Sequence, residues 1–543
     1  MSARGAIAAL GAAALAALAA GCSETEAGPA PVKPAHPRAV VVLGIDGMDP
    51  QITRRLLAAG QMPNLAALIA KGGLSELDTT SPPQSAVAWS TIVSGHGPEA
   101  HGIFDFVHRD PALLEPYESI SRPEPPSFEF DLGPWKFSIG GGEMELLREG
   151  RTFWQLLEDA GVPATVVKIP ANFPPAPTSQ AESVSGMGTP DLLGTNGIFQ
   201  LFTDDPAIKG PLKGGELHRL DFAGGQRATS SMTGPVNPTS SDGEAMTLEV
   251  EIVRDRTRDV ALIRLGDQDV VLAAGEWSDW IPVGFDPGVL GGPVPGMVRL
   301  YLRQVRPTVH LFSTPINIDP LDPAMPLSSP ERYAADLARA TGRYYTQGMP
   351  ENTKALSSGA LNEEEFLSIV DRVMDETEAA LDHELSRFTG GLLFVYLSSI
   401  DQTSHVFYRS MQPDAPEDEK AYADVIPSLY RRVDAWIPRI LEKVPEGTEL
   451  VIMSDHGFAP YHTKVHLNTF LARRGYLTVL PPEERTPGSL GHIDWSQTQA
   501  YAYGLNQLFL NLEGRERHGV VPPSERDVLL RRIEADLLSL RDP

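Results

Sequence analysis

The stretch Ala39–Met48, AVVVLGIDGM, decides how the fold begins. Its apolar, mostly β-branched residues follow one another without polar alternation, which is typical of a strand buried on both faces of a parallel sheet. The run ends in Asp46 and Gly47. In open α/β sheets ligands bind beyond the carboxyl ends of the strands, and a glycine lets the backbone turn closely there. We therefore expect Asp46 at the edge where chemistry occurs, the alternative being an ordinary cap of the next helix.

A second informative stretch is Ser81–Ile103, SPPQSAVAWSTIVSGHGPEAHGI. Pro82 and Pro83 block strand pairing, and the small, apolar run after them is typical of a buried helix start. Ser85 thus stands where a loop becomes a helix. At that position free amide groups and the helix dipole favour an anion such as phosphate. Serine is also a common N-cap, so this loop alone does not distinguish a nucleophile from a cap.

Two further buried strands are predicted at Gly391–Ile400 and Glu449–Met453. Residue types that suit a metal ion follow these two strands, namely Asp401, His405, Asp455 and His456. The first two are four residues apart, so they share a face if a helical turn follows the strand. Together with Asp46, the pattern predicts that three strands deliver acids to one edge of the sheet.

The rest of the chain divides into α/β and β-rich parts. Thr152–Val167 predicts a helix followed by a strand, Val184–Leu193 a loop, and the residues after Ser328 two long helices. Between Phe199 and Thr314 short strands alternate with charged or Gly-Pro turns, and Met297–Val305 is among those strands. We therefore predict an α/β catalytic domain over residues 39–198 and 315–543, with an antiparallel β insertion at 199–314.

The N-terminus predicts a lipoprotein signal. Arg4 is followed by an apolar run too short to span a membrane, and Leu18–Cys22, LAAGC, resembles a bacterial lipobox. Cys22 is the only cysteine, so it suits a lipid anchor and excludes a disulfide within the monomer. Residues 1–21 would be removed, and 22–38 would form a flexible tether. Ser23 after the cysteine implies, by resemblance to such lipoproteins, the outer membrane of a bacterial cell envelope.

Composition limits the class of partner. The 543 residues carry 45 basic and 71 acidic side chains, a net charge of −26. Such a charge disfavours nucleic acid polymers and anionic membrane surfaces as partners held by charge attraction. The length calls for one large domain with insertions or for two domains, and oligomeric state cannot be read from the sequence.

Four motifs occur in a fixed order: GIDGM, PPQSxxxWS with SGxxPxxHGI behind it, SxDxxxH and SDHGF. Together they resemble the alkaline phosphatase superfamily, and within it the type I phosphodiesterase/nucleotide pyrophosphatase-like phosphohydrolases. The resemblance implies an alkaline-phosphatase-like fold, with a mostly parallel central sheet flanked by helices. It also implies that phosphate esters are hydrolysed through a phosphorylated serine, here Ser85, above two divalent ions.

The resemblance also assigns metal ligands. One ion would be held by Asp46, Ser85, Asp455 and His456. The other would be held by Asp401, His405 and a further histidine, which in such relatives follows in a Gly-x-His context. Gly491-His492 is of a similar local type, so His492 is the predicted ligand, whereas His462 and His466 are expected at the surface. The relatives continue beyond this histidine with a strand and a helix, so the chain ending at Pro543 is expected to be truncated.

This ligand set would explain the chemistry, because a metal-bound serine is a strong nucleophile and two cations can stabilise an in-line phosphoryl transfer. Asp and His ligands are compatible with zinc, with manganese as the alternative. A sulfatase would need Pro and Arg where Val87 and Trp89 stand, and a phosphoglycerate mutase does not suit an envelope protein. A phosphomonoesterase, a phospho-headgroup transferase and a non-catalytic envelope lipoprotein with an incomplete metal site remain the alternatives.

Overall fold

The computed structural model describes residues 38–139, 143–288, 292–486, 488, 490–505 and 507–541. The predicted signal peptide, the Cys22 anchor and all of the predicted tether except Arg38 lie outside these residues. Residues from Pro34 onward form one compact unit, distinct from residues 1–33. Within the described part of the chain, no helix combines the length and apolar character that crossing a membrane requires.

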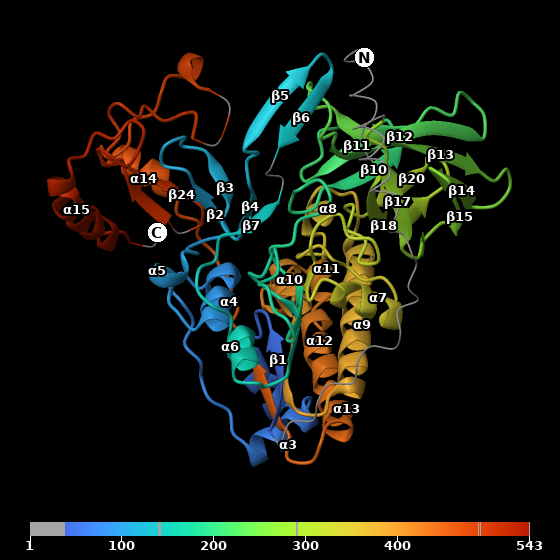
Figure 1. The fold of residues 1–543 in the computed structure, drawn as a ribbon, viewed down its shortest axis with the longest axis horizontal. Helices are drawn as coiled ribbons and strands as arrows, with labels where there is room; N and C mark the ends of the chain where they lie inside the picture. Colours follow the sequence, from blue (N-terminus) through green and yellow to red (C-terminus); the bar gives the residue numbers. More distant parts are fainter. Residues whose placement is uncertain are drawn as a thin grey trace, which may run out of the picture. The chain divides into compact units, whose positions relative to one another are not determined.

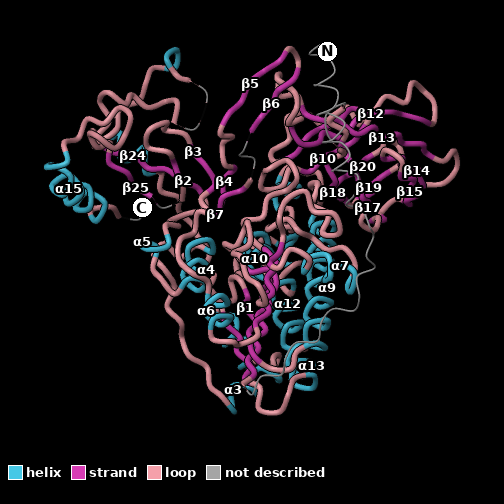
Figure 2. The backbone as a smooth tube through the Cα atoms, in the orientation of Figure 1, coloured by secondary structure: helices cyan, strands magenta, loops and turns pink. Residues whose placement is uncertain are grey.

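A six-stranded sheet lies at the centre of the fold (Figures 1 and 2). Its strands in spatial order are β21 (Ser328–Ser329), β9 (Glu182–Ser185), β8 (Ala164–Ile169), β22 (Gly391–Leu397), β1 (Ala39–Ile45) and β23 (Glu449–Met453). All neighbouring pairs are parallel except β21 with β9. This arrangement confirms the prediction of a mostly parallel α/β sheet, and it brings the carboxyl ends of β1, β22 and β23 to one edge.

Both faces of the sheet are covered by helices, which explains the continuous apolar runs of its strands. On one face Leu393 and Val395 of β22 pack in the main apolar core together with helices α2 (Pro50–Ala58), α3 (Pro63–Lys71), α9 (Glu363–Arg387), α12 (Val425–Asp434) and α13 (Trp436–Lys443). On the other face Phe394 and Tyr396 pack with α4 (Ser85–Ser94) and α6 (Phe153–Asp159). Figure 1 shows α4 and α6 on one side of β1 and α9, α12 and α13 on the other. Gly44 is required between them, because a Cβ there would lie 2.6 Å from the Phe394 ring.

The helices begin and end with recognisable local signals. The part of the chain before the β-rich segment contains α2 (Pro50–Ala58), α3 (Pro63–Lys71), α4 (Ser85–Ser94), α5 (Pro98–His101) and α6 (Phe153–Asp159). The part after it contains α7 (Tyr333–Thr341), α8 (Thr353–Ser357), α9 (Glu363–Arg387), α10 (Ser399–Phe407), α11 (Glu417–Lys420), α12 (Val425–Asp434), α13 (Trp436–Lys443), α14 (Leu467–Arg473) and α15 (Arg526–Leu538). Asn362 closes a capping box at the start of α9, the longest of these helices.

The β-rich segment forms sheets of its own. Its strands are β10 (Phe199–Thr203), β11 (Gly215–Arg219), β12 (Arg227–Val236), β13 (Ala245–Arg254), β14 (Val260–Leu265), β15 (Gln268–Ala273), β16 (Glu276–Trp277), β17 (Ile281–Phe285), β18 (Val294–Val298), β19 (Leu300–Gln304) and β20 (His310–Ser313). Strands β12 to β15 form an antiparallel four-stranded meander. All other pairs are antiparallel too, except β10 with β11.

Short ribbons and a C-terminal cluster complete the fold. Between α5 and α6 lie β2 (Val107–Arg109), β3 (Pro116–Glu118), β4 (Ser121–Pro123), β5 (Phe128–Leu132), β6 (Trp135–Ile139) and β7 (Met144–Leu146), paired β2–β3, β4–β7 and β5–β6. After β23, strands β24 (Ala500–Tyr503) and β25 (Gln507–Leu510) form a hairpin that packs with α14 and α15 in a separate apolar cluster.

Three expectations about elements were wrong in detail. The strand at Glu449–Met453 is not buried on both faces, because β23 is the edge of the sheet and Val451 is 41% exposed. The predicted loop at Val184–Leu193 begins inside strand β9. The run Met297–Val305 is two strands, because the chain breaks at Arg299, where β18 leaves its pairing with β17 and β19 joins a different sheet.

Candidate metal centre and active site

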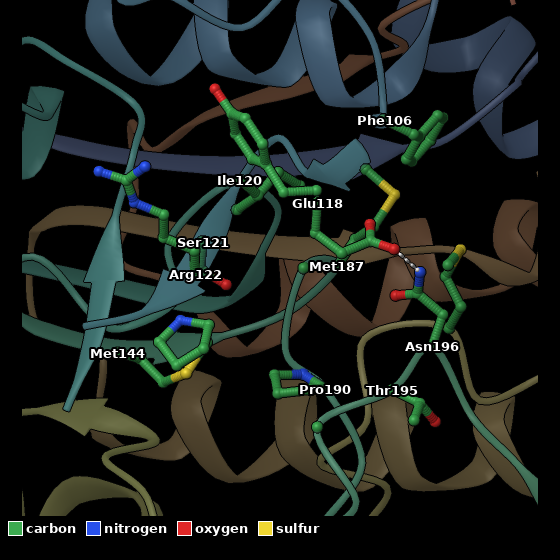
Figure 3. A pocket seen from close by; sticks show the side chains of 15 residues that line it. Phe106, Glu118, Ile120, Ser121, Arg122, Met144, Met187, Pro190, Thr195 and Asn196 are labelled. Carbon is green, nitrogen blue, oxygen red and sulfur yellow. Dashed lines mark hydrogen bonds between the residues drawn. The ribbon is translucent and has the colours of Figure 1, made fainter. Parts of the chain in front are cut away.

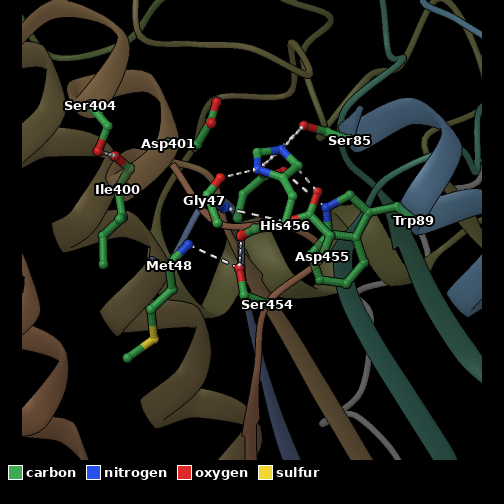
Figure 4. A network of polar contacts seen from close by, with 12 residues as sticks. Gly47, Met48, Ser85, Trp89, Ile400, Asp401, Ser404, Ser454, Asp455 and His456 are labelled. Atoms are coloured by element: carbon green, nitrogen blue, oxygen red, sulfur yellow. Dashed lines mark hydrogen bonds and ion pairs between the residues drawn. The ribbon is translucent and has the colours of Figure 1, made fainter. Parts of the chain in front are cut away.

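Four segments that are far apart in the sequence meet at the carboxyl edge of the central sheet (Figure 4). Asp46 follows β1, Asp401 lies in the first turn of α10 after β22, and Asp455 with His456 follows β23. The fourth segment ends in Ser85, the first residue of α4. The three strands therefore deliver acidic residues to one edge, as the sequence predicted.

Asp46 divides its two oxygens between different partners. Its Oδ2 accepts hydrogen bonds from Tyr396 Oη at 2.7 Å and Trp89 Nε1 at 2.9 Å. Its Oδ1 lies 3.2 Å from Ser85 Oγ and 3.4 Å from His456 Nε2. The two neutral donors fix the carboxylate from one side, which leaves Oδ1 directed at the serine.

His456 is oriented so that one ring nitrogen points into the site. Its Nδ1 lies 2.8 Å from the carbonyl oxygen of Gly457, which can only accept, so Nδ1 carries the proton and donates. The lone pair of Nε2 then faces Ser85 Oγ at 2.9 Å and Asp455 Oδ2 at 3.4 Å. A histidine that binds a metal ion through one ring nitrogen usually donates from the other to a carbonyl or carboxylate oxygen. His456 has the tautomer that this arrangement needs.

Ser85 lies where the helix can hold an anion. It is the first residue of α4, and its N-cap Gln84 makes no side-chain capping bond. The first amide groups of a helix have no acceptor within the helix, so those of Ser85 and Ala86 can donate to phosphate oxygens. The hydroxyl has two acceptors within 3.2 Å, one on His456 and one on Asp46. The sequence prediction of a serine at a loop-to-helix transition is confirmed.

A second, smaller group lies beside the first. His405 Nε2 is 3.4 Å from Asp401 Oδ2 on successive turns of α10, the same-face geometry expected from their spacing. Gly47, with φ +64°, brings the backbone against this aspartate, since a Cβ there would lie 2.8 Å from Asp401 Oδ1. A side chain at Gly47 would therefore separate the two groups.

The electrostatics favour a cation. Burial and the neighbouring Asp401 raise the pKa of Asp46 to about 6, against the lowering effects of His456, Tyr396 and Trp89. Burial and the charge of Asp46 raise the pKa of Asp455 well above its ordinary value. Buried acids that repel one another in this way bind protons strongly unless a positive charge is supplied.

The residues present fit divalent metal ions. Oxygen and nitrogen ligand atoms of Asp46, Asp455 and His456 all lie within 4.8 Å of one another. In addition, Asp455 Oδ2 and Asp401 Oδ1 are buried with no hydrogen-bond partner among the described residues. An unpaired buried carboxylate oxygen is costly, and coordination of an ion would satisfy it.

The predicted third ligand of the second group is not brought to it. Within the described ranges, Asp401, His405 and His492 do not form a three-membered ligand group. His492 lies between α14 and β24, where its carbonyl oxygen accepts from Leu480 N at 2.8 Å. His462 and His466 lie in the exposed segment after His456, as expected for surface residues.

Sequence reasoning gave no role to the residues that orient the site from behind. In the sequence Tyr396 is one residue of an apolar run that predicts a buried strand. The available signal is that a buried tyrosine hydroxyl usually needs a hydrogen-bond partner. No pattern in the sequence singles out Asp105 either. Its Oδ2 accepts from Gln84 Nε2 at 3.4 Å and from Leu505 N at 2.8 Å, so it connects the residue before Ser85 with the β24–β25 hairpin.

A serine at a helix N-terminus, with acids and a histidine converging beside it at the edge of a parallel sheet, is the arrangement of a candidate hydrolase site with residues that could hold a metal ion. The family model described as type I phosphodiesterase / nucleotide pyrophosphatase matches residues 40–203 and 323–543. The chain therefore belongs to this family of the alkaline phosphatase superfamily. No curated protein and no solved structure matches it significantly. The unmatched residues 204–322 include strands β11 to β20.

Proposed function

We propose that the protein hydrolyses phosphodiester or pyrophosphate bonds through a phosphorylated Ser85. The observation that carries this proposal is the position of Ser85 Oγ, 2.9 Å from His456 Nε2 and 3.2 Å from Asp46 Oδ1 at the start of α4. A hydroxyl held by two acceptors, with free helix amides behind it, is oriented to attack a phosphorus atom.

Two divalent ions, preferably zinc with manganese as the alternative, would be the cofactors. Asp46, Ser85, Asp455 and His456 would hold one ion, and Asp401 with His405 the other. When bound, such ions supply positive charge that activates a hydroxyl and neutralises phosphate oxygens. The chain itself orients Asp46 through Tyr396 and Trp89, and it keeps Asp46, Asp401 and Asp455 nearly inaccessible to bulk water.

The leaving group of the substrate would occupy a neighbouring pocket (Figure 3). Its lining combines apolar side chains with a few polar ones, including Phe106, Tyr117, Glu118, Ile120, Arg122, Met144, Met187, Asn196 and Met349. Ile120 packs in the same small cluster as Ala86, the neighbour of the nucleophile. A hydrogen bond of 2.7 Å between Asn196 and Glu118 fixes one wall. Methionines adapt to varied apolar shapes, which suits a bulky organic group.

Replacing the nucleophile tests this proposal. Ser85→Ala should abolish turnover of a soluble aryl phosphodiester while most metal stays bound through Asp46, Asp455 and His456. Ser94→Ala is the matched control, because this buried serine of the same helix donates only to the Ser90 carbonyl at 2.7 Å. Unchanged hydrolysis and unchanged ester binding in Ser85→Ala would contradict the proposal.

A specific observation favours a second candidate, a non-catalytic envelope protein. Among the described residues the second ligand group contains only Asp401 and His405. Plasma mass spectrometry of the purified chain distinguishes the candidates, because two tightly held ions support the hydrolase and one or none supports the non-catalytic protein. Parallel assays with a monoester, a diester and a diester plus an acceptor alcohol would identify a phosphomonoesterase or a phospho-headgroup transferase instead.

We also infer that the protein is anchored in a bacterial cell envelope through a lipid on Cys22. The LAAGC sequence at Leu18–Cys22 supports this inference, and the compact unit from Pro34 onward would follow the anchor. Labelling with a radioactive fatty acid should mark the wild-type chain and not Cys22→Ala. Equal labelling of both chains, or none, would exclude the anchor.

A further inference from the structure

The β5–β6 hairpin carries an apolar face whose β5 side chains are exposed, while Trp135 and Phe137 of β6 are half-buried. The antiparallel register pairs Phe130 with Phe137 and Leu132 with Trp135, so these side chains share one face with Phe128. On β5, Phe128 is 58%, Phe130 43% and Leu132 65% exposed. Exposed apolar residues that are contiguous in this way indicate an interaction surface rather than scattered surface residues.

The two faces of the hairpin differ sharply in chemistry. Glu129, Lys136 and Ser138 lie on the opposite face, where Glu129 accepts from Ser138 and pairs with Lys136, each at 3.1 Å. On the apolar face the ring centroids of Phe130 and Phe137 are 5.2 Å apart and stacked. The hairpin is therefore amphipathic, with its charges held on one side and its aromatic rings on the other.

Main-chain hydrogen bonds hold the hairpin in place. Lys136 N donates to Thr239 O at 2.9 Å, and Ser241 N donates to Pro134 O at 3.1 Å. At its base the chain continues into the β4–β7 ribbon, whose Met144 lines the same pocket as Ile120. The apolar face is thus presented by a hairpin that is hydrogen-bonded to the β-rich segment and lies next to β4 and β7 (Figure 1).

The size of the face argues against a stable dimer. Specific protein interfaces bury about 800 Å² on each partner and involve roughly 20–30 residues a side. The hairpin offers five apolar side chains on this face. A lipid bilayer needs no complementary shape, and Trp and Phe side chains are favoured at its interface.

The position of the predicted anchor makes a bilayer available. From Ser23 to Arg38 the chain has sixteen residues, which extend over at most about 55 Å. Tethering at this distance gives a high effective concentration, which adds to the affinity of the apolar contact itself. The net charge of −26 excludes attraction to anionic lipids, so the contact must be apolar.

We propose that the aromatic face of the β5–β6 hairpin is a membrane-docking surface, which inserts Phe128, Phe130 and Leu132 into the interface of a lipid bilayer. This inference rests on the proposed envelope location, and it requires neither hydrolysis nor metal binding. The hairpin is joined along the chain to the β4–β7 ribbon, which contributes Met144 to the pocket wall, so docking would hold the pocket close to the lipid.

Co-sedimentation with neutral phosphatidylcholine vesicles tests the proposal. The chain from Pro34 onward is used, because it is a compact unit without the apolar leader. It should bind vesicles equally at low and high salt, and the triple variant Phe128→Ser, Phe130→Ser, Leu132→Ser should lower the partition coefficient by more than about tenfold. Thermal unfolding should be nearly unchanged, because the replaced side chains are largely exposed.

A matched control replaces three comparably exposed apolar residues elsewhere, Leu77→Ser, Val271→Ser and Val528→Ser, and should bind like the unaltered chain. No vesicle binding, or equal loss in the control, would overturn the proposal. A dimer in light scattering that only the hairpin variant dissociates would also overturn it, because a second copy would then cover the face. Hydrolysis of a soluble diester by the same preparations tests the proposed function separately.

Discussion

The buried carboxylate of Asp46 makes the stability of the metal-free protein depend on pH. Its pKa is raised from 3.8 to about 6 in the folded chain, first by burial and then by Asp401. The folded state therefore holds this proton more tightly than the unfolded state does. The resulting stabilisation is complete below pH 3.8 and is lost as the pH rises through 6.

The shift corresponds to roughly 3 kcal/mol in total, of which about 2 kcal/mol is lost between pH 4.5 and pH 7. Urea unfolding of the chelated protein, followed by tryptophan fluorescence, measures the free energy of unfolding at the two pH values. Other groups titrate over the same range, so the comparison is with Asp46→Asn, which keeps the shape and cannot ionise. The unaltered chain should lose about 2 kcal/mol more than this variant on going to pH 7.

Equal pH dependence in the two proteins would refute the reasoning, since Asp46 would then ionise alike in the folded and unfolded chains. Adding zinc should restore stability at pH 7 and have little effect at pH 4.5, because metal and proton compete for the same carboxylate. A zinc effect of equal size at both pH values would mean that the ion is held elsewhere.

Two further changes have effects that the structure determines. Tyr396→Phe removes one of the two donors to Asp46 Oδ2, so the zinc affinity measured by chelator competition should fall by about 10–100-fold. An unchanged affinity would show that the tyrosine does not position Asp46. Arg109→Met removes the buried 2.5 Å ion pair with Glu516, which keeps the half-exposed Arg515 as a partner at 2.8 Å, and should cost about 1–3 kcal/mol in urea unfolding. Arg54→Met at an exposed pair should cost less than about 1 kcal/mol, and equal losses in both would contradict the burial argument.

Much of the site could be predicted because its residues come directly after strands of unmistakable type. Asp46 and Asp401 succeed continuous apolar runs, and parallel strands that share a direction must bring the residues at their carboxyl ends to the same edge. The Asp401 and His405 spacing needed only a helical turn, which α10 provides. Local pattern and sheet topology were sufficient for these residues.

Other features depend on contacts that no local pattern carries. The edge position of β23 results from the absence of a further neighbour among the described strands, which its apolar sequence does not reveal. Tyr396 orients Asp46 across 350 positions of the chain, and Asp105 reaches Leu505 across 400. His492 matched by local type, yet its surroundings are those of the C-terminal cluster. Pairings of this kind become visible only when the chain is folded.

The bridge made by Asp105 has a consequence for how the protein can be divided. Because one carboxylate oxygen holds both Gln84 and the turn of the last hairpin, the loop that ends in Ser85 is braced by residues about 400 positions later. The C-terminal cluster thus supports the loop that ends in Ser85 and is not a separable appendage. Loop exchanges or truncations near Leu505 would therefore disturb the position of Ser85, and these two distant parts of the chain have to be engineered as one piece.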